Sequence, residues 1–439
     1  MPLRYDIAYS IAGLAAAPVL GYRMLRTGKW RTDWSGRLGR GPALHNGEAE
    51  RAPTILLHAV SVGEVNAIRL LVQHLAGRDD APRLVISTTT DTGHARATEL
   101  YANHHTVVRY PLDFTPCVRR FLDRVQPDVV ALTELELWPN FVAQCAKRDI
   151  PVCVINGRLS DRSFRNYRRF TPLVRPTFAG VTVAAVQSPT YASRFEALGT
   201  PIERIRVLDT MKWDTAELAD DVPGSDALAR AMGIDPSRPV VVAGSTGDGE
   251  EQMLIDLLPT WPEGTQLLLV PRKPERFDEV AQLAPHAVRR SEHPDDGTPS
   301  HPGSPYERRV LLLDTMGELR KAYALANVAI VGRSFNGWGG SDPIDPIALG
   351  CPTIIGPDHA NFHDVVAAMR GAGGIRVTDT PGPVVAELLD DAETAYALAE
   401  AGRAVIRRRQ GATDRHAELL MELLAEKKGA EGPRGRGAE

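Results

Sequence analysis

The stretch TILLHAVSVGEVNAIRLLVQHLAGRDDAPRLVIST, residues 54–88, predicts the fold of this chain. It begins with a continuous apolar run at 54–59 and turns at Gly63 into an amphipathic run at 65–75. A second apolar run follows at 84–88. Continuous apolar strands joined by a helix are typical of a parallel sheet that helices cover on both faces. We therefore expect a strand, a helix and a second, parallel strand here.

The same alternation of short apolar runs and longer amphipathic runs continues along most of the chain. In the first half it predicts strands at 106–110, 129–133, 152–156 and 181–186, and helices at 117–124 and 140–148. After Pro223 it restarts and predicts strands at 240–243, 267–270, 310–313, 328–331 and 353–355. The sequence thus predicts an α/β protein with two doubly wound, Rossmann-like domains in tandem.

The length of 439 residues suits two domains better than one. We divide the chain into an N-terminal segment, 1–30, a first domain, 31–210, a second domain, 211–426, and a disordered tail, 427–439. A stretch rich in Pro, His, Asp and Ser, 286–308, is expected to be a mobile surface insertion. Ligands of open α/β sheets bind beyond the carboxyl ends of the strands, so two such domains facing each other would enclose a site in a cleft.

The composition is that of a soluble globular protein, with 43% hydrophobic and 24% charged residues and a formal net charge of -4. This balance does not favour a polyanion, so nucleic acid is not an expected partner. The four cysteines are scattered, at Cys117, Cys145, Cys153 and Cys351. Without paired spacing they predict neither a disulfide framework nor a zinc site, and we expect buried thiols in a reducing compartment.

The N-terminus departs from this soluble pattern. Residues 7–20 are nearly uncharged and precede a basic cluster made of Arg23, Arg26, Lys29, Arg31 and Arg37. A helix of that length covers about 21 Å, against roughly 30 Å for the hydrocarbon core of a bilayer. Shallow insertion into a membrane surface, with the basic residues on the cytoplasmic side, is therefore favoured over a clean span. A signal peptide and an ordinary buried helix are the alternatives.

The turn after the first predicted strand places Glu64 in the first turn of the next helix. An acidic residue at that position commonly does no more than complement the helix dipole. A carboxylate at the carboxyl end of a sheet is also suited to accept a proton from an attacking sugar hydroxyl, provided that its pKa lies near the working range. The residues alone leave both interpretations open.

Two further groups of polar residues follow the next strands of the first domain. Glu134 and Glu136 alternate with apolar residues after 129–133, and in extended geometry they would share one face. A solvated strand end is the alternative. Arg158 and the arginines of 162–169 follow 152–156. Such a run is commonly a solvated helix face, but the same side chains are suited to an acceptor that carries phosphates or carboxylates.

In the second domain, the strand at 240–243 leads into Gly-Ser-Thr-Gly-Asp-Gly-Glu-Glu, residues 244–251. The absence of a Lys-Ser/Thr pair excludes a P-loop NTPase, although the hydroxyls and amides of this loop are suited to one phosphate. The strand at 328–331 leads into a glycine-rich loop and then into the start of a helix that carries Asp345. The glycines allow a ligand to approach the backbone closely, and a helix start favours an anion. The Asp345 carboxylate is suited to hold a ribose hydroxyl. No Asp-x-Asp spacing occurs, so a metal-independent reaction with a single-phosphate donor is favoured.

Together these stretches resemble the 3-deoxy-D-manno-octulosonic acid (Kdo) transferases of lipid A biosynthesis, from the N-terminal segment to about residue 408. The stretches that carry the resemblance are His58-Ala-Val-Ser-Val-Gly-Glu64, Glu134-Leu-Glu-Leu-Trp-Pro-Asn140, Asn156-Gly-Arg-Leu-Ser160, Gly244-Ser-Thr246, Pro271-Arg272 and Asp314-Thr-Met-Gly-Glu-Leu319. The resemblance implies a GT-B fold and an inverting, metal-independent transfer of Kdo from CMP-Kdo to the lipid A precursor lipid IV-A. It implies no cofactor, and a place at the cytoplasmic side of the inner membrane in lipopolysaccharide biosynthesis.

The resemblance also implies roles for individual residues, with Glu64 as the general base. The residues assigned to the anionic acceptor are Glu134, Glu136, Arg158 and Ser160. Those assigned to the CMP-sugar are Lys212, Ser245, Thr246, Arg272, Met316, Gly317, Glu318, Gly339, Gly340 and Asp345, and no metal ligand is assigned. The His-Asn and Leu-Glu-Pro usual in the family read Ser341-Asp342 and Ile344-Asp345-Pro346 here. Transfer of another sugar, a nucleotide-sugar epimerase or hydrolase, and a non-catalytic paralogue are the alternatives.

Overall fold

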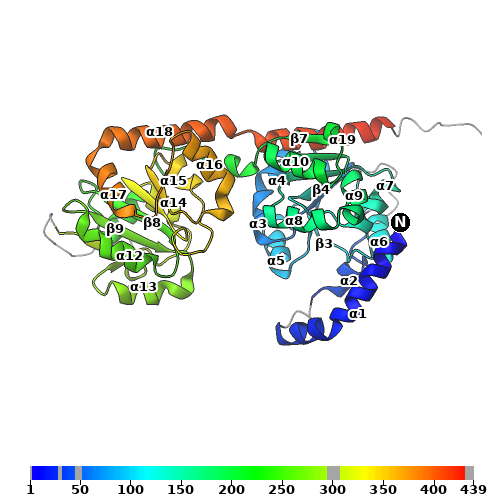
Figure 1. Cartoon of the computed structure of the whole chain (residues 1–439), viewed down its shortest axis with the longest axis horizontal. Coiled ribbons are helices and arrows are strands. Elements are labelled where there is room, and N and C mark those ends of the chain that lie inside the picture. Colours follow the sequence, from blue (N-terminus) through cyan, green and yellow to red (C-terminus); the bar gives the residue numbers. More distant parts are fainter. Residues whose placement is uncertain (1, 28–31, 45–51, 294–306, 431–439) are drawn as a thin grey trace, which may run out of the picture. The chain divides into compact units, whose positions relative to one another are not determined.

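The computed structural model describes residues 2–27, 32–44, 52–293 and 307–430. Within them the chain forms two compact units (Figure 1). The first unit contains the described residues up to Asp214 and from Gly411 onward, and the second is Thr215–Gln410. Each unit contains its own parallel sheet, so the predicted pair of doubly wound α/β domains is confirmed.

The sheet of the first unit has seven parallel strands in the order β3-β2-β1-β4-β5-β6-β7. The strands are β1 (Thr54–His58), β2 (Arg83–Thr88), β3 (Thr106–Arg109), β4 (Val129–Thr133), β5 (Val152–Gly157), β6 (Val183–Val186) and β7 (Ile205–Val207). Successive side chains of a strand point to opposite faces. Ile55 and Leu57 therefore pack in one apolar cluster and Leu56 in another, and β1 is buried along its whole length.

Helices cover both faces of this sheet. They are α2 (Trp34–Arg37), α3 (Val62–Ala67), α4 (Arg69–Ala76), α5 (Asp91–Tyr101), α6 (Thr115–Val125), α7 (Pro139–Ala146), α8 (Asp161–Arg169), α9 (Thr171–Ala179) and α10 (Pro189–Leu198). The helix expected at 65–75 is divided into α3 and α4 at Ile68. All four cysteines of the chain are buried thiols, as expected.

The second unit repeats the plan, with the parallel strand order β10-β11-β9-β8-β12-β13-β14. The strands are β8 (Val240–Thr246), β9 (Gln266–Pro271), β10 (Val288–Arg289), β11 (Arg309–Leu312), β12 (Val328–Val331), β13 (Thr353–Ile355) and β14 (Arg376–Val377). The helices are α11 (Ser225–Met232), α12 (Glu250–Leu257), α13 (Phe277–Leu283), α14 (Leu319–Tyr323), α15 (Ile344–Ala348), α16 (His363–Gly371), α17 (Pro381–Asp390) and α18 (Ala392–Arg409). Apolar clusters lie on both faces of the sheet.

Three strands were not predicted, and all three lie at or near a sheet edge. β7, β10 and β14 contain only two or three residues each, too few to show a pattern of apolar residues. β10 lies within the stretch expected to be a mobile insertion, 286–308, and pairs with β11. Its Arg289 binds Asp314 at 2.8 Å. Residues 294–306 of that stretch lie outside the described residues.

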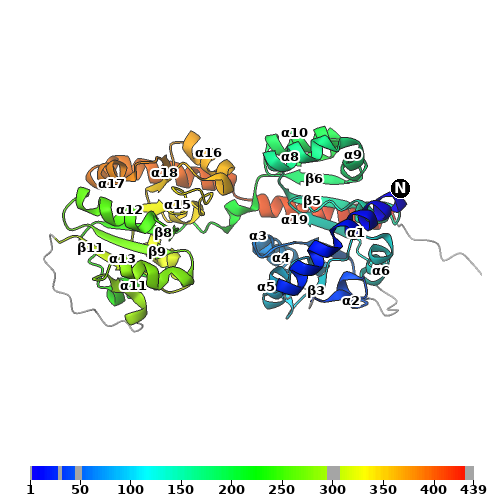
Figure 2. The same cartoon turned by 60° about the horizontal axis from the view of Figure 1, so that its bottom comes forward.

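The last helix corrects the expected domain boundary at residue 426. α19 (Ala412–Ala430) belongs to the first unit, where it lies along α4, β4 and β5 (Figure 2). Ala417, Leu420 and Leu424 are buried in the same apolar cluster as β1. The chain therefore leaves the first domain after Asp214 and returns to it at Gly411. Most of the expected tail, 431–439, lies outside the described residues.

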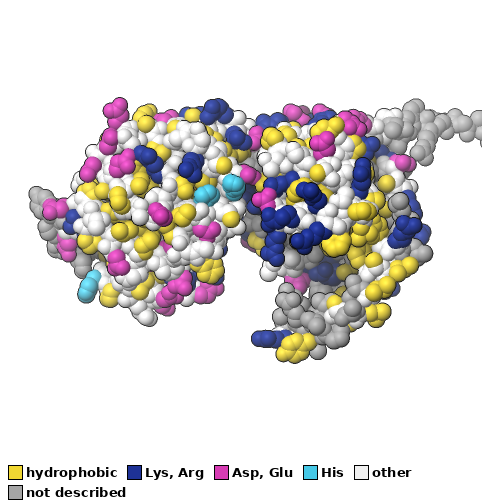
Figure 3. All heavy atoms as spheres, in the orientation of Figure 1, with side chains coloured by type: hydrophobic (Ala, Val, Ile, Leu, Met, Phe, Trp, Pro, Cys, Tyr) yellow, Lys and Arg dark blue, Asp and Glu magenta, His cyan; other side chains and the backbone are white. Residues whose placement is uncertain are grey.

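The N-terminal segment forms one long helix, α1 (Pro2–Thr27), that extends beyond the expected run at 7–20. Its exposed apolar side chains include Ile7, Ile11 and Leu14, which are 52%, 64% and 78% exposed and follow one face at helical spacing. Hydrophobic side chains are visible along α1 in Figure 3. No helix within the described residues is both long and apolar enough to cross a bilayer.

Candidate active site and nucleotide loops

Glu64 lies at the carboxyl end of the first sheet, where β1 turns into α3. Ser61 precedes α3 as its N-cap, so Glu64 falls in the first helical turn, as expected. Its carboxylate accepts the backbone N–H of Val60 at 2.9 Å and the Ser61 hydroxyl at 3.0 Å. Burial raises the pKa of Glu64 from 4.5 to about 7, and the charges of Glu134 and Glu136 also raise it. A carboxyl with that pKa is suited to general-base work near neutral pH.

Glu134 and Glu136 lie in the loop between β4 and α7, but not on one face of an extended strand. β4 ends at Thr133, and Glu134 has a φ of 59°, in the left-handed region where the chain turns. Its N–H donates to the Ile155 carbonyl at 3.0 Å, which joins the ends of β4 and β5. Glu136 accepts the Trp138 indole N–H at 3.1 Å, and burial raises its pKa. A turn thus gathers the carboxylates near Glu64.

A buried aspartate, Asp113, positions the helix that follows this loop. It accepts the backbone N–H groups of Asn140 at 3.0 Å and Phe141 at 2.8 Å, at the start of α7. The Tyr9 hydroxyl of α1 donates to it at 3.0 Å, and Asp6 accepts the Asn140 amide at 2.9 Å. Burial raises the pKa of Asp113 to about 6. Sequence reasoning missed this network, because its members are far apart in the chain.

His58, which begins the stretch that carries Glu64, is a core residue. Its ring stacks on that of Tyr110 with 3.8 Å between centroids, and its Nδ1 contacts the Ser87 hydroxyl at 2.9 Å. Complete burial lowers the pKa of His58 to about 3, so the ring is neutral at working pH. It supports the strand end rather than exchanging a proton.

The predicted acceptor residues Arg158 and Ser160 lie between β5 and α8. Ser160 caps α8 by accepting the N–H of Ser163 at 3.2 Å. No residue of α8 is buried, and a cluster of Lys and Arg side chains is visible over this helix in Figure 3. The helix therefore presents a basic, accessible surface on the first unit.

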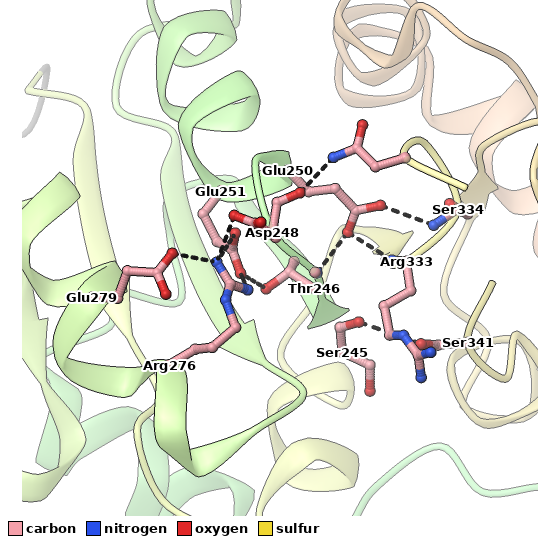
Figure 4. Close-up of polar contacts among 12 residues, drawn as sticks. Ser245, Thr246, Asp248, Glu250, Glu251, Arg276, Glu279, Arg333, Ser334 and Ser341 are labelled. Carbon is pink, nitrogen blue, oxygen red and sulfur yellow. Dashed lines mark hydrogen bonds and ion pairs between the residues drawn. The ribbon is translucent and has the colours of Figure 1, made fainter. Parts of the chain in front are cut away.

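In the second unit, two donors at the end of β8 and in the loop after it bind two buried glutamates (Figure 4). The Thr246 hydroxyl donates to Glu251 at 2.7 Å, and the Gly247 N–H donates to Glu250 at 2.8 Å. Arg276 binds both oxygens of Glu251, at 2.7 and 3.0 Å. These contacts leave neither the hydroxyl proton nor that amide for a phosphate.

Glu250 also fixes the glycine-rich loop that follows β12. Its carboxylate accepts the backbone N–H groups of Arg333 at 2.6 Å and Ser334 at 2.8 Å (Figure 4). It also accepts the N–H of Phe335 at 3.0 Å. With the Gly247 amide, four donors converge on one carboxylate. The sequence contains no signal for this role, because an acid at a helix start is common for reasons of the helix dipole alone.

The assigned donor residues Ser245, Thr246, Gly339 and Gly340 come together where β8 and the glycine-rich loop meet. The Ser245 carbonyl accepts the Ser341 hydroxyl at 3.3 Å across the two segments. Gly339 and Gly340 both have a φ of 79°, a conformation that glycine adopts at little cost.

The other assigned donor residues lie elsewhere on the described structure. Met316 is exposed after β11, beside Gly317 with a φ of 89°. Glu318 is partly buried, but hydrogen bonds from Thr315 and Arg290 hold its pKa below the usual value. These residues follow a different strand end from Ser245.

Asp345 and Lys212 are the last two residues of the set assigned to the donor. Asp345 is in the first turn of α15 and faces Arg320 at 3.5 Å. The neighbouring Asp342, whose charge the family pattern lacks, accepts the Ile344 N–H at 3.0 Å and so stabilises the same helix start. Lys212 is in a 3-10 turn, Met211–Thr215, and belongs to the first unit rather than to the second as expected.

A cavity of about 210 Å³ adjoins the loop after β8 in the second unit. It is lined by Thr246, Gly247, Asp248, Arg272, Lys273, Arg276, Glu279, Arg333 and Trp338. Of these, only Thr246 and Arg272 were assigned to a ligand from the sequence. Arg333 and Trp338 lie in the glycine-rich loop after β12 and were assigned no role, because spacing does not show which loop side chains converge.

Comparisons with known proteins find similar sequences over most of this chain. A family model described as 3-deoxy-D-manno-octulosonic-acid transferase (kdotransferase) matches residues 32–215. The 3-deoxy-D-manno-octulosonic acid transferase of Haemophilus influenzae is 32% identical over 386 residues, which cover 84% of this chain and 87% of that protein. The Bordetella pertussis enzyme of the same name is 31% identical over 435 residues, covering 95% and 99%.

A likeness to a solved structure extends over both units. The crystal structure of Anabaena HepE in complex with UDP-glucose has a TM-score of 0.53 and 15% sequence identity to this chain. The match covers 86% of this chain and 99% of HepE, and at that identity it is a likeness of fold. The expected GT-B fold is confirmed.

Proposed function

Because this chain belongs to the family of 3-deoxy-D-manno-octulosonic acid transferases, we propose that it transfers Kdo from CMP-Kdo to lipid IV-A. Membership makes the chain a glycosyltransferase of lipopolysaccharide biosynthesis. The donor, the acceptor and the course of the reaction are the proposal. The observation that carries it is the partly buried Glu64, whose pKa is raised to about 7 at the carboxyl end of a parallel sheet.

In the proposed reaction, Glu64 accepts the proton of an acceptor hydroxyl while that oxygen attacks the anomeric carbon of Kdo. The bond between this carbon and the phosphate oxygen breaks, and CMP leaves with the electron pair. Attack opposite the leaving phosphate inverts the anomeric centre. Arginine and lysine side chains of the second unit would neutralise the single phosphate, so the reaction would need no divalent ion.

The Val60 N–H and the Ser61 hydroxyl would orient the Glu64 carboxylate toward the acceptor. The charges of Glu134 and Glu136 favour the protonated form of Glu64, and so help it to hold the proton after attack. Phosphates of a lipid A precursor would bind Arg158 and the exposed arginines of α8. In this proposal the acceptor binds to the first unit.

We propose further that α1 lies in the surface of the inner membrane on its cytoplasmic side. Ile7, Ile11 and Leu14 form an exposed apolar face along one side of this helix, which is suited to shallow insertion among lipid chains. Contacts of Tyr9 and Asp6 with Asp113 and Asn140 hold α1 against the first unit. A lipid acceptor would thus reach the enzyme within the bilayer surface.

The proposed reaction is tested by incubating the protein with CMP-Kdo and a tetraacyl lipid A precursor in the presence of EDTA. We expect transfer of Kdo with inversion, and a loss of roughly 100-fold or more in kcat for Glu64→Gln, because the general base is removed. The control is Glu196→Gln, an exposed residue of α10. Donor hydrolysis without transfer would favour a hydrolase, and an unchanged Glu64→Gln rate would contradict the role of Glu64.

Membrane association is tested by sedimentation with vesicles that contain anionic phospholipid. The variant Ile7→Ser/Ile11→Ser/Leu14→Ser is expected to lose most of its binding, because the buried apolar area is lost. The control is Tyr396→Ser in α18, a similarly exposed apolar side chain at 70%. Equal binding by the triple variant and the wild type would rule out α1 as the contact.

A further inference from the structure

The cavity beside β8 keeps a net positive charge. Arg272, Lys273, Arg276 and Arg333 line it, against the carboxylates of Asp248 and Glu279 in its lining and of Glu251 behind Arg276. Arg276 is already held by both oxygens of Glu251 and by Glu279 at 3.1 Å. Arg272, Lys273 and Arg333 line the same cavity, and no carboxylate among the described residues pairs with any of the three. Three unpaired cations around a cavity of about 210 Å³ favour an anionic ligand.

The backbone of Arg333 is held in a conformation that an arginine rarely adopts. The φ of Arg333 is 58°, in the left-handed region of backbone conformation. Glycine adopts this region at a lower cost in free energy than arginine does. Its N–H donates to Glu250 at 2.6 Å, and its carbonyl accepts the Gly340 N–H at 2.7 Å. Figure 4 shows the side chain pointing away from Glu250. The fold thus fixes the point on the loop from which the Arg333 side chain leaves the backbone.

Trp338 forms the apolar part of the same cavity. The Lys273 ammonium lies 6.0 Å and the Arg333 guanidinium carbon 5.9 Å from the centroid of its ring. A Cβ at Gly247 would come within 3.1 Å of the Arg333 side chain and 3.6 Å of the indole, so glycine permits this close approach. Trp338 is 47% exposed, which leaves part of its ring for a ligand.

We propose that Arg333 and Lys273 bind an anionic group of the donor, the phosphate or the sugar carboxylate, with Trp338 packed against the donor. The volume of about 210 Å³ equals roughly seven water-sized groups, enough for such an anion with the atoms bonded to it. The inference rests on the proposed function for the identity of the donor. It makes Arg333 a residue that determines donor affinity and is positioned by Glu250.

The test replaces Arg333 with glycine, which removes the cation and relieves the left-handed backbone. We expect Arg333→Gly to unfold at the same or a higher temperature, because glycine adopts the left-handed backbone at lower cost. We also expect the KM for CMP-Kdo to rise about tenfold or more, with kcat little changed, because a charge-assisted contact is lost. Arg333→Lys should recover part of the affinity. The matched control is Asp149→Gly, also at a positive φ of 52° but in the first unit, which should gain stability without a change in KM.

Direct binding separates the two anionic groups and does not depend on transfer. CMP and free Kdo are titrated separately while tryptophan fluorescence is recorded, with Trp338→Phe to identify the signal of Trp338. Weaker CMP binding by Arg333→Gly supports the phosphate, and unchanged CMP binding with a raised KM for CMP-Kdo supports the carboxylate. Wild-type transfer with unchanged KM and CMP affinity in Arg333→Gly overturns the inference. Absence of wild-type transfer overturns the proposed function instead.

Discussion

Replacing Glu64 with glutamine is expected to change stability in a way that depends on pH. The folded domain holds the Glu64 proton more tightly than the unfolded chain, because burial raises its pKa from 4.5 to about 7. The stabilisation by this proton is fully present below the unfolded pKa and is lost as the pH rises through about 7. The ionised carboxylate therefore costs the native first domain roughly 3 kcal/mol above that pH.

Glutamine removes this cost without removing the local contacts. Its amide oxygen can accept the Val60 N–H, and its amide nitrogen can donate to the Ser61 hydroxyl oxygen. Relative to the wild type, Glu64→Gln should therefore be roughly equal in stability near pH 5 and about 2–3 kcal/mol more stable near pH 8. The variant gains stability where it loses activity, as expected for a buried catalytic acid or base.

The assay is urea denaturation of the wild type and Glu64→Gln at both pH values, with the transition of the first domain analysed separately. Glu196→Gln serves as the exposed control, and its difference from wild type should not vary with pH. A stability difference for Glu64→Gln that is the same at both pH values would refute the raised pKa. In parallel, kcat/KM of the wild type should fall about tenfold per pH unit below about 7, as Glu64 becomes protonated.

Three further predictions concern the two domains. Leu420→Ala in α19 should destabilise the first domain by about 2–5 kcal/mol in urea denaturation and leave the transition of the second unchanged; the reverse would contradict the place of α19. Gly244→Ala should destabilise the second domain by about 2 kcal/mol or more, because its Cβ would lie 2.0 Å from the Tyr323 hydroxyl, and Tyr323→Phe should restore part of the loss. Glu250→Gln should lower the melting temperature of the second domain and raise the KM for the donor, because an amide cannot accept all four N–H groups. An unchanged KM would show that the loop holds its shape without the carboxylate.

Much of the fold follows from local pattern. The runs at 129–133, 328–331 and 353–355 coincide with β4, β12 and β13, because strands buried on both faces are apolar throughout. The place of Glu64 in the first turn of α3 also follows from the sequence. Residues 412–426 of α19 were assigned to the second domain by their order in the chain, which does not show the sheet against which a helix packs.

The candidate site was predictable only in part, for a physical reason. Residue types, spacing and the resemblance show which groups can bind or exchange a proton, and so they made Glu64, Glu134 and Arg272 candidates. The left-handed turn at Glu134, and the convergence of Glu250 on four amides from two segments, depend on contacts between residues distant in the chain.

The sequence by itself determined two parallel-sheet domains and the acid at the first strand end. Only the tertiary structure decided that the Thr246 hydroxyl and the Gly247 amide bind two buried glutamates, and that Arg333, Lys273 and Trp338 share a cavity. Burial and convergence arise from packing and not from local pattern.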